Sequence, residues 1–336
     1  MKVLQVIPGN SINGSLLYSN FIENEIEGLR REGVEIKKFF FISRKSIFGL
    51  LNSKSKLEKE INLYKPDLIH VHTGSTTSFL VAISRKKKIP WIVTFGGSEL
   101  LGNHQPSIKW KVRDKISILL SRISAKLSNG IICVSKNLQA ILPNSTLKKS
   151  IVIPRGIDIQ HFKPINKLEA RGLLKINPER QIVIFSLNRK EAVVKNKVLA
   201  DQVISVLQQK YRIDVSLISL IGYSRDEILL LLNAADALLL TSLHEGSPNI
   251  VKEAMACNLP VVSVNCGDVK ERLKDVKNSF VHSYDVKSLS ESLNDVLNSR
   301  TRSNGREILL NQRLDRQSIS LQISKFYKEV IDKHKF

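Results

Sequence analysis

Two glutamates in the second half of the chain have the residue type and spacing of a ligand-binding pair. Glu245 and Glu253 lie in the segment EGSPNIVKEAMA, and each carboxylate can accept hydrogen bonds from hydroxyl groups. The apolar runs 237–240 and 261–264 on either side predict two buried strands of a parallel sheet, joined by a helix that contains Glu253. Both glutamates are therefore expected where the strands end, beside the start of that helix.

The start of this helix predicts an anion site. Ser247 can cap the helix, and Pro248 in its first turn gives up no hydrogen bond. Free N–H groups and the helix dipole at such a start both favour negative charge. A nucleotide diphospho-sugar has an anion in its middle and hydroxyl groups at both ends, so Glu245 is predicted to hold the sugar and Glu253 the ribose. The alternative makes Glu245 a dipole-stabilising residue and Glu253 a solvated helix charge.

The two glutamates, in the setting EGSPNIVKEAMACNLPVV, resemble the signature of retaining glycosyltransferase family 4, also described as glycosyl transferases group 1. That resemblance implies the GT-B fold of class α/β, with two Rossmann-like domains that face each other across a cleft. It predicts an acceptor-binding domain over 1–162, a nucleotide-sugar-binding domain over 163–315, and a helix over 316–336 that packs back on the first domain. The implied donor-binding residues are Gly14, Arg189, Lys195, Glu245, Gly246, Ser247, Pro248, Asn249 and Glu253.

Positive charge for the donor diphosphate is predicted after the apolar run 181–185. Arg189 and Lys195 follow this run, and the family places an arginine and a lysine there, so the resemblance implies that they act in catalysis with Glu245. Lys190 is a competing candidate for the lysine, and a solvated basic loop is the alternative. The early glycine loop lacks both the lysine of a P-loop and a G-x-G-x-x-G motif, which argues against an ATP or NAD enzyme.

The first domain supplies fewer catalytic candidates. The family often carries His-Gly-Ser-Asp in the loop that reads Phe-Gly-Gly-Ser-Glu here, so Gly96 replaces the histidine and Glu99 the aspartate. A catalytic histidine is therefore not transferred. His72, Glu99 and His104 are the acceptor-side candidates, and each histidine is alternatively a plain loop residue.

Composition limits the possible partners. The chain has 52 Lys+Arg against 31 Asp+Glu, a net charge of +21 that predicts attraction to nucleic acid or anionic lipid, unless it reflects a lysine-rich solvated surface. Aromatic residues make up only 6%, without basic and aromatic residues interleaved along a strand, so no specific nucleic-acid partner is expected. Cys133, Cys257 and Cys266 lack metal-ligand spacing and are expected to be buried and reduced, and no metal or cofactor is predicted.

The segment 107–127 is strongly amphipathic and basic. Its apolar residues recur at helical spacing between lysines and arginines, and Trp110 lies among the lysines. Such a helix either lies on an anionic membrane surface or packs on the domain core with a basic exterior. The N-terminal MKVLQVIPGN lacks the features of a signal peptide, and no apolar run reaches 18 residues, so we expect a cytoplasmic protein, peripheral on the membrane in the first case.

The predicted reaction is transfer of a sugar from a nucleotide diphosphate-sugar to a hydroxyl of a saccharide or lipid-linked saccharide, in polysaccharide or glycan biosynthesis. Stabilisation of the leaving diphosphate needs no metal when cations and helix amides supply the charge. Retention of configuration is implied by the resemblance alone. The alternatives are a nucleotide-sugar epimerase of the same fold, a phosphorylase, for which the chain is short, and a non-enzymatic nucleic-acid-binding protein. The sugar, base and acceptor stay open.

Overall fold

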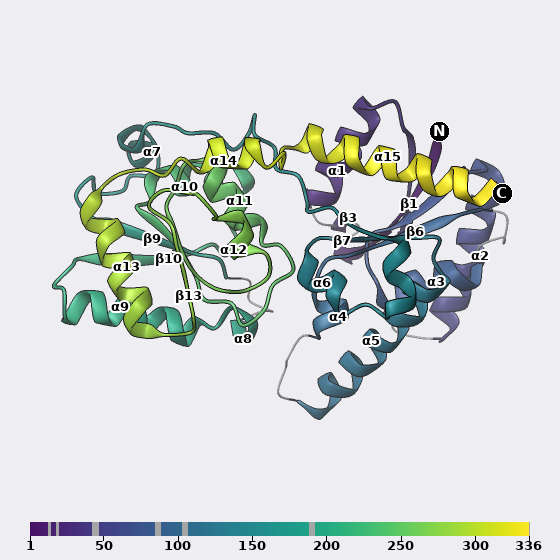
Figure 1. Ribbon diagram of the computed structural model, residues 1–336, viewed down its shortest axis with the longest axis horizontal. Helices are drawn as coiled ribbons and strands as arrows, with labels where there is room; N and C mark the ends of the chain where they lie inside the picture. Colours follow the sequence, from purple (N-terminus) through teal and green to yellow (C-terminus); the bar gives the residue numbers. More distant parts are fainter. Residues whose placement is uncertain are drawn as a thin grey trace. The chain divides into compact units, whose positions relative to one another are not determined.

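The chain forms two compact units in a computed structural model (Figure 1). The structure describes residues 1–12, 15–17, 20–41, 47–84, 89–102, 107–187 and 192–335. The first unit comprises Met1–Gly156 with Arg316–Phe336, and the second comprises Ile157–Asp315. The first unit ends six residues before the predicted boundary at residue 162. The reason is that Ile157 pairs with Asp315 in a parallel bridge and Phe162 is fully buried in the core of the second unit.

The first unit is built on a parallel sheet of six strands in the order β4-β1-β5-β6-β7-β8. Its strands are β1 (Lys2–Pro8), β4 (Glu35–Phe41), β5 (Leu68–Val71), β6 (Trp91–Phe95), β7 (Gly130–Cys133) and β8 (Ser150–Val152). Neighbouring residues of β1 enter the cores on opposite faces of the sheet, Val3 on one face and Leu4 on the other. Burial on both faces explains why the strands read as continuous apolar runs. Gln5 in β1 and His70 in β5 are polar side chains with no exposed surface.

Helices cover this sheet on both faces. They are α1 (Asn20–Arg31), α2 (Ile47–Tyr64), α3 (Ser75–Ser84), α4 (Ser98–Leu101), α5 (Ile108–Leu127), α6 (Lys136–Ala140), the 3₁₀ helix η1 (Asn144–Lys149) and α15 (Arg316–Lys335). The C-terminal helix α15, yellow in Figure 1, lies along α1. Gly28 permits this approach, since a Cβ there would lie 2.0 Å from the Ser320 hydroxyl.

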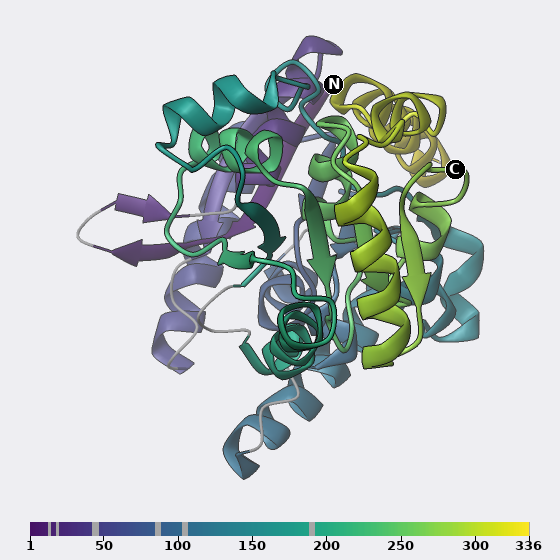
Figure 2. The same ribbon diagram turned by 90° about the vertical axis from the view of Figure 1, so that its left-hand side faces the viewer.

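A short antiparallel hairpin replaces part of the predicted glycine loop between β1 and α1. Its strands are β2 (Asn10–Ile12) and β3 (Ser15–Leu17), with Ile12 opposite Ser15. Figure 2 shows the hairpin as a pair of purple arrows that belong to neither large sheet. Gly14 lies outside the described residues.

The second unit repeats the parallel α/β plan with five strands in the order β10-β9-β11-β12-β13. The strands are β9 (Gln181–Phe185), β10 (Val215–Ser219), β11 (Ala237–Leu240), β12 (Val261–Val264) and β13 (Phe280–His282). The helices are α7 (Lys167–Leu173), α8 (Ala192–Lys195), α9 (Lys197–Gln209), α10 (Arg225–Ala234), α11 (Asn249–Ala256), α12 (Val269–Arg272), α13 (Val286–Ser299) and α14 (Gly305–Asn311). The two apolar runs that frame the glutamates form β11 and β12, so the predicted βαβ unit is confirmed.

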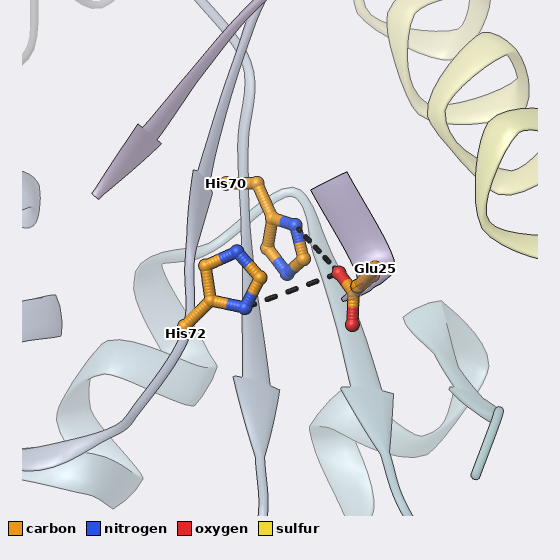
Figure 3. Close-up of side chains that lie close together, drawn as sticks. All are labelled: Glu25, His70 and His72. Atoms are coloured by element: carbon orange, nitrogen blue, oxygen red, sulfur yellow. Dashed lines mark ion pairs between the residues drawn. The ribbon is translucent and has the colours of Figure 1, made fainter. Parts of the chain in front are cut away.

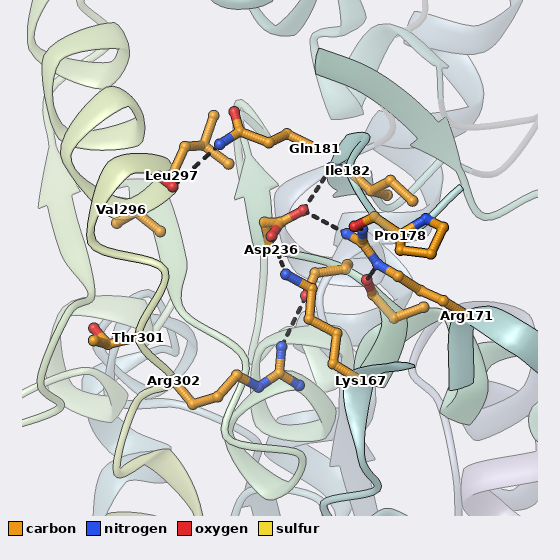
Figure 4. A network of polar contacts seen from close by, with 12 residues as sticks. Lys167, Arg171, Pro178, Gln181, Ile182, Asp236, Val296, Leu297, Thr301 and Arg302 are labelled. Carbon is orange, nitrogen blue, oxygen red and sulfur yellow. Dashed lines mark hydrogen bonds and ion pairs between the residues drawn. The ribbon is translucent and has the colours of Figure 1, made fainter. Parts of the chain in front are cut away.

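An ionic network ties together the amino ends of β9 and β11 (Figure 4). Asp236 accepts hydrogen bonds from the backbone N–H of Ile182 at 2.7 Å and from Arg171 Nη2 at 3.0 Å. Lys167 contacts its other carboxylate oxygen, and Arg171 is 1% exposed. This network lies at the opposite edge of the sheet from the two glutamates and serves the fold.

Candidate functional site

Glu245 lies beyond the carboxyl end of β11 and forms an ion pair with Lys195, the last residue of α8. The Lys195 Nζ to Glu245 Oε1 distance is 2.6 Å, and the two side chains are only 12% and 15% exposed. The backbone folds closely here, since a Cβ on Gly267 would lie 2.8 Å from the carbonyl oxygen of Gly246. The structure therefore brings two of the predicted site residues together at one point.

Glu253 lies inside α11 and is buried, with a side chain 7% exposed. Arg225, the first residue of α10, donates a hydrogen bond from Nη1 to Glu253 Oε1 at 2.7 Å. Its guanidinium also lies 4.4 Å from the centre of the Phe162 ring. The alternative of a solvated helix charge is therefore wrong for Glu253.

Arg225 is a site residue that sequence reasoning missed. The signal was present as a capping box, because Ser224 accepts from the backbone N–H of Glu227, whose carboxylate accepts from the backbone N–H of Ser224. That motif fixes residue 225 in the first turn of α10. It does not reveal which carboxylate the arginine meets, because Glu253 arrives from a different helix.

The start of α11 differs in one detail from the prediction. Pro248 is the N-cap residue and Asn249 begins the helix, while Ser247 donates its hydroxyl hydrogen to Asp268 Oδ2 at 2.8 Å and makes no cap. Burial raises the pKa of Asp268, and the charges of Lys252 and Arg272 counteract part of that rise. Pro248 at the N-cap makes no side-chain hydrogen bond to the helix. The first N–H groups of a helix lack partners within the helix, so such a start can bind an anion.

Three predicted site residues, Gly14, Arg189 and His104, lie outside the described residues, as does Lys190, the competitor of Lys195.

The carboxylate of Glu99 holds its own loop together. Its two oxygens accept hydrogen bonds from the backbone N–H groups of Gly96, at 2.6 Å, and Gly97, at 3.1 Å. A Cβ on Gly96 would lie 2.8 Å from Arg155 Nη2. The space beside Gly96 is therefore taken by an arginine that the sequence had not singled out.

His72 is buried in a polar cluster at the carboxyl end of β5. Its Nε2 lies 2.5 Å from Gln5 Oε1, and only 4% of the residue is exposed. His70, two residues earlier, contacts the hydroxyls of Tyr327 at 2.6 Å and Thr94 at 2.7 Å. Burial lowers the pKa of His70 to about 3 and that of His72 well below its usual value, so both rings are neutral at pH 7. His72 is therefore a buried residue after β5, and its acceptor-side role stays a prediction.

Glu25, from α1, completes this cluster (Figure 3). Its Oε1 lies 3.8 Å from His70 Nδ1 and 3.9 Å from His72 Nδ1. Burial raises the pKa of Glu25 to about 7, although the Arg155 charge lowers it. Two histidines and a carboxylate are possible metal ligands, but ligands of a tetrahedral zinc ion lie only about 3.4 Å apart, and a buried guanidinium opposes a further cation. Sequence reasoning missed Glu25, because nothing local to α1 marks it.

The three cysteines are buried and free, as predicted. Burial raises the pKa of each thiol to about 12, so they are unreactive at neutral pH.

Helix α5 presents its apolar residues to solvent, against the alternative of a core-facing helix. Ile108 is 79% exposed, Leu119 58% and Trp110 40%, with Val112, Ile116 and Leu127 also exposed. The helix packs instead through small residues. Ser121 accepts from the backbone N–H of Ser75 at 2.8 Å, and Ser124 accepts from the Ser78 hydroxyl at 2.9 Å. An open groove of about 450 Å³ adjoins it, lined by Leu119, Arg122, Ile123, Lys126, Ile141, Leu142, Pro143 and Asn144.

Within the described ranges, no helix combines the length and apolar character needed to span a bilayer.

Sequence and structure comparisons place this geometry among known proteins. Residues 17–161 match the model of Glycosyltransferase Family 4, and residues 174–311 match that of Glycosyl transferases group 1. The chain is 24% identical over 251 residues to the UDP-Gal:alpha-D-GlcNAc-diphosphoundecaprenol alpha-1,3-galactosyltransferase of Escherichia coli, which covers 66% of this chain. The match spans 63% of that relative's length, less than two thirds.

Solved structures share the fold at low sequence identity. Sucrose-phosphate synthase from Thermosynechococcus elongatus superimposes with a TM-score of 0.78 at 16% identity, covering 99% of both chains. Anabaena HepE in complex with UDP-glucose gives a TM-score of 0.72 at 17% identity, covering 98% of this chain and all of the other. The two parallel α/β units and the two family matches show that the chain belongs to the GT-B glycosyltransferases, with a Glycosyltransferase Family 4 first unit and a Glycosyl transferases group 1 second unit.

Proposed function

We propose that this protein transfers a sugar from a nucleotide diphosphate-sugar to a hydroxyl group of a saccharide or lipid-linked saccharide. The observation that supports this most directly is the pair of carboxylates near the start of α11, Glu253 buried and Glu245 partly buried. Each has a cation at hydrogen-bond distance, Lys195 for Glu245 and Arg225 for Glu253. The cation fixes one oxygen of each carboxylate, which leaves acceptor capacity for the hydroxyls of a sugar and a ribose.

In this function the second unit binds the donor and stabilises its leaving group. The N–H groups at the start of α11 and the ammonium of Lys195 offset the negative charge that grows on the diphosphate. Arg189 adds to this charge in our proposal. Glu245 orients the sugar and Glu253 the ribose, so that the reacting carbon is held in place.

We further propose that the reaction is independent of a metal ion and retains the configuration of the sugar. The support for metal independence is that Lys195 and the helix start provide positive charge where the diphosphate is expected. The support for retention is the resemblance of the two-glutamate segment to a retaining family. The hydroxyl then attacks from the face on which the diphosphate leaves.

Calorimetric titration with UDP, GDP, ADP and their common sugar conjugates tests the donor assignment. We expect one nucleotide family to bind, and Glu253→Ala to weaken this binding about tenfold or more, because it removes a charge-assisted hydrogen bond. Glu291→Ala, an exposed glutamate on α13, is the matched control and should bind like the wild type. If the wild type binds none of these nucleotides, the proposed function is wrong.

Helix α5 supports peripheral binding to an anionic membrane, where a lipid-linked acceptor would be located. Its exposed face combines apolar residues with Lys109, Lys111, Arg113 and Lys115, all of them exposed. A helix of this kind inserts its apolar side chains among lipid headgroups while its cations meet anionic lipid. The galactosyltransferase of Escherichia coli has a diphosphoundecaprenol-linked acceptor by its name, which fits this location.

Flotation with vesicles tests the membrane proposal. We expect binding to vesicles of phosphatidylglycerol and phosphatidylcholine, and none to phosphatidylcholine alone. Replacing Lys109, Lys111 and Lys115 by Gln should weaken binding about 100-fold, at about 1 kcal/mol for each charge. The control replaces the exposed Lys274, Lys277 and Lys287 of the second unit by Gln and removes the same net charge. Equal weakening by both triple variants would show attraction by net charge alone.

A further inference from the structure

The hydrogen bond between His72 and Gln5 has a fixed direction. Gln5 Oε1 is a carbonyl oxygen and can only accept, so His72 Nε2 carries the hydrogen and its Nδ1 carries a lone pair. Gln5 Nε2 donates to the hydroxyl of Tyr327 at 3.1 Å. The Tyr327 hydroxyl also lies 2.6 Å from His70 Nδ1, and Thr94 fits His70 in either tautomer. These directions therefore fix His72 Nδ1 as an acceptor.

Glu25 Oε1 faces the lone pair of His72 Nδ1, and it lies 3.8 Å from His70 Nδ1, beyond hydrogen-bond distance. It is closed to solvent and has no hydrogen-bond partner among the residues that the structure describes. A carboxylate in such a place is destabilised, so the group has a high affinity for a proton. The Glu25 side chain as a whole is 11% exposed, so the carboxylate is not fully closed to solvent.

Arg155 counteracts this effect. Its guanidinium lies 3.3 Å from the centre of the Phe21 ring, and its charge interacts favourably with Glu25 and Glu99. The guanidinium lowers the pKa of Glu25, whereas burial raises it, and the balance is a pKa of about 7. A general base is most effective when its pKa lies near the working pH, because it is then both ionised and basic. Among the described residues, Tyr327 from α15, Thr94 from β6 and Gln5 from β1 also contact the histidines of the cluster.

We propose that Glu25 is the base that accepts the proton of the attacking acceptor hydroxyl, and that His72 and Arg155 are positioning residues that set its basicity. This inference rests on the proposed function and names a group that the donor site does not provide. Glu25 in α1, His72 after β5 and Arg155 after β8 all lie at the carboxyl edge of the first sheet. That edge is where parallel α/β sheets bind their ligands.

The proton transfer balances with the sugar transfer. The acceptor O–H bond breaks and its proton passes to the carboxylate of the ionised Glu25. The acceptor oxygen forms a bond to the anomeric carbon, while the bond from that carbon to the diphosphate oxygen breaks. The electron pair of that bond leaves with the nucleoside diphosphate. Glu25 afterwards releases the proton to solvent, so the products are the glycoside, the nucleoside diphosphate and one proton.

Glu25→Gln tests this role with the full chain, the nucleotide sugar that calorimetry selects, and octyl glycosides as hydroxyl acceptors. Glutamine keeps the shape but cannot take a proton. We expect kcat to fall about 10²- to 10⁴-fold while the donor Kd stays unchanged. The wild type should lose activity as the pH falls through about 7, and the variant should lack this acid limb. Glu27→Gln is the matched control, because Glu27 is on the same helix, 47% exposed, and pairs with Arg316.

The pH profile of Arg155→Met distinguishes an effect on the basicity of Glu25 from a purely structural role of Arg155. Removing the cation should shift the acid limb to higher pH, since Arg155 lowers the pKa of Glu25. A merely loosened fold would lower the rate at every pH without moving the limb.

Four results would overturn the inference. If Glu25→Gln keeps the wild-type kcat and acid limb, Glu25 is not the base, and the proposed function stands as long as the wild type transfers sugar. If the acid limb of Arg155→Met lies at the same pH as that of the wild type, Arg155 does not lower the pKa of Glu25. If the purified wild type holds one equivalent of zinc that His72→Ala loses, the cluster is a metal site. A wild type that binds no nucleotide sugar would refute both proposals together.

Discussion

The carboxyl edges of the two sheets use glutamate in opposite ways. In the second unit, Glu245 and Glu253 each have a cation at 2.6–2.7 Å. In the first unit, Glu25 has two imidazole nitrogens at 3.8–3.9 Å, beyond hydrogen-bond distance. A carboxylate with a cation beside it keeps its negative charge and orients hydroxyl groups, whereas one that faces lone pairs tends to take up a proton. The partners of a carboxylate therefore decide whether it holds a ligand or moves a proton.

The amino edge of the second sheet provides a third case, in which a paired carboxylate serves stability alone. Asp236→Asn should destabilise the second unit by about 3–5 kcal/mol, because it leaves the buried Arg171 without its counter-charge. Calorimetric unfolding measures this loss. The transition of the second unit is identified as the one whose unfolding temperature rises when a nucleotide is bound. Asp214→Asn is the control, with a side chain 84% exposed and Arg180 at 4.0 Å. If Asp236→Asn changes the free energy of unfolding by less than 1 kcal/mol, the carboxylate at the amino edge does not stabilise the second unit in the proposed way.

Loss of the cation beside Glu245 should abolish most of the transfer activity. Lys195→Met removes positive charge from the expected diphosphate position, and we predict a kcat about 10²- to 10³-fold lower. Lys197→Met is the control, since Lys197 lies two residues further on and forms an exposed pair with Asp201. Initial rates at saturating donor distinguish the two variants. Equal rates for both would show that Lys195 does not stabilise the leaving diphosphate.

Much of the second unit could be predicted from sequence because its site is local. The apolar runs before and after EGSPN specify β11 and β12, so Glu245 and Glu253 could be placed within one βαβ unit. The partner of Glu253 could not, because Arg225 precedes it by 28 residues on another helix. The cap was also misassigned, since Asp268 from beyond β12 takes the Ser247 hydroxyl.

The first unit's site was harder to predict because its members are distant in sequence. The cluster joins Glu25 to His72 and, through Gln5 and His70, to Tyr327, and no spacing rule connects these positions. Helix α5 shows a second limit of sequence patterns. Its periodicity predicts a helix correctly, but the pattern does not tell which face is buried, and here serines take that place.

The raised pKa of Glu25 predicts a stability cost that depends on pH. The pKa is about 7 in the fold against 4.5 as its ordinary value. Between these values the folded protein keeps a proton that the unfolded chain has lost, so stability falls as the pH rises. Above pH 7 the cost reaches about 3 kcal/mol. Glu25→Gln, which stays neutral, should therefore raise the unfolding temperature of the first unit at pH 8.

The same variant should change little at pH 4, where Glu25 is protonated in both states. Calorimetry at pH 4, 6 and 8 measures the trend. A gain of equal size at all three pH values would come from packing and would contradict the titration of Glu25. Higher stability at pH 8 together with lower activity is expected when a residue is needed for function although it destabilises the fold.

Arg225→Gln should have the smallest of these effects and is the most selective test of the donor side. It removes the charge-assisted bond to Glu253, so we expect the donor KM to rise about tenfold. The kcat should stay unchanged, because the ribose lies away from the bond that breaks. Arg180→Gln, at a side chain 53% exposed, is the control. A fall in kcat with an unchanged KM would place Arg225 near the reacting sugar, and Glu253 could then no longer be the ribose ligand.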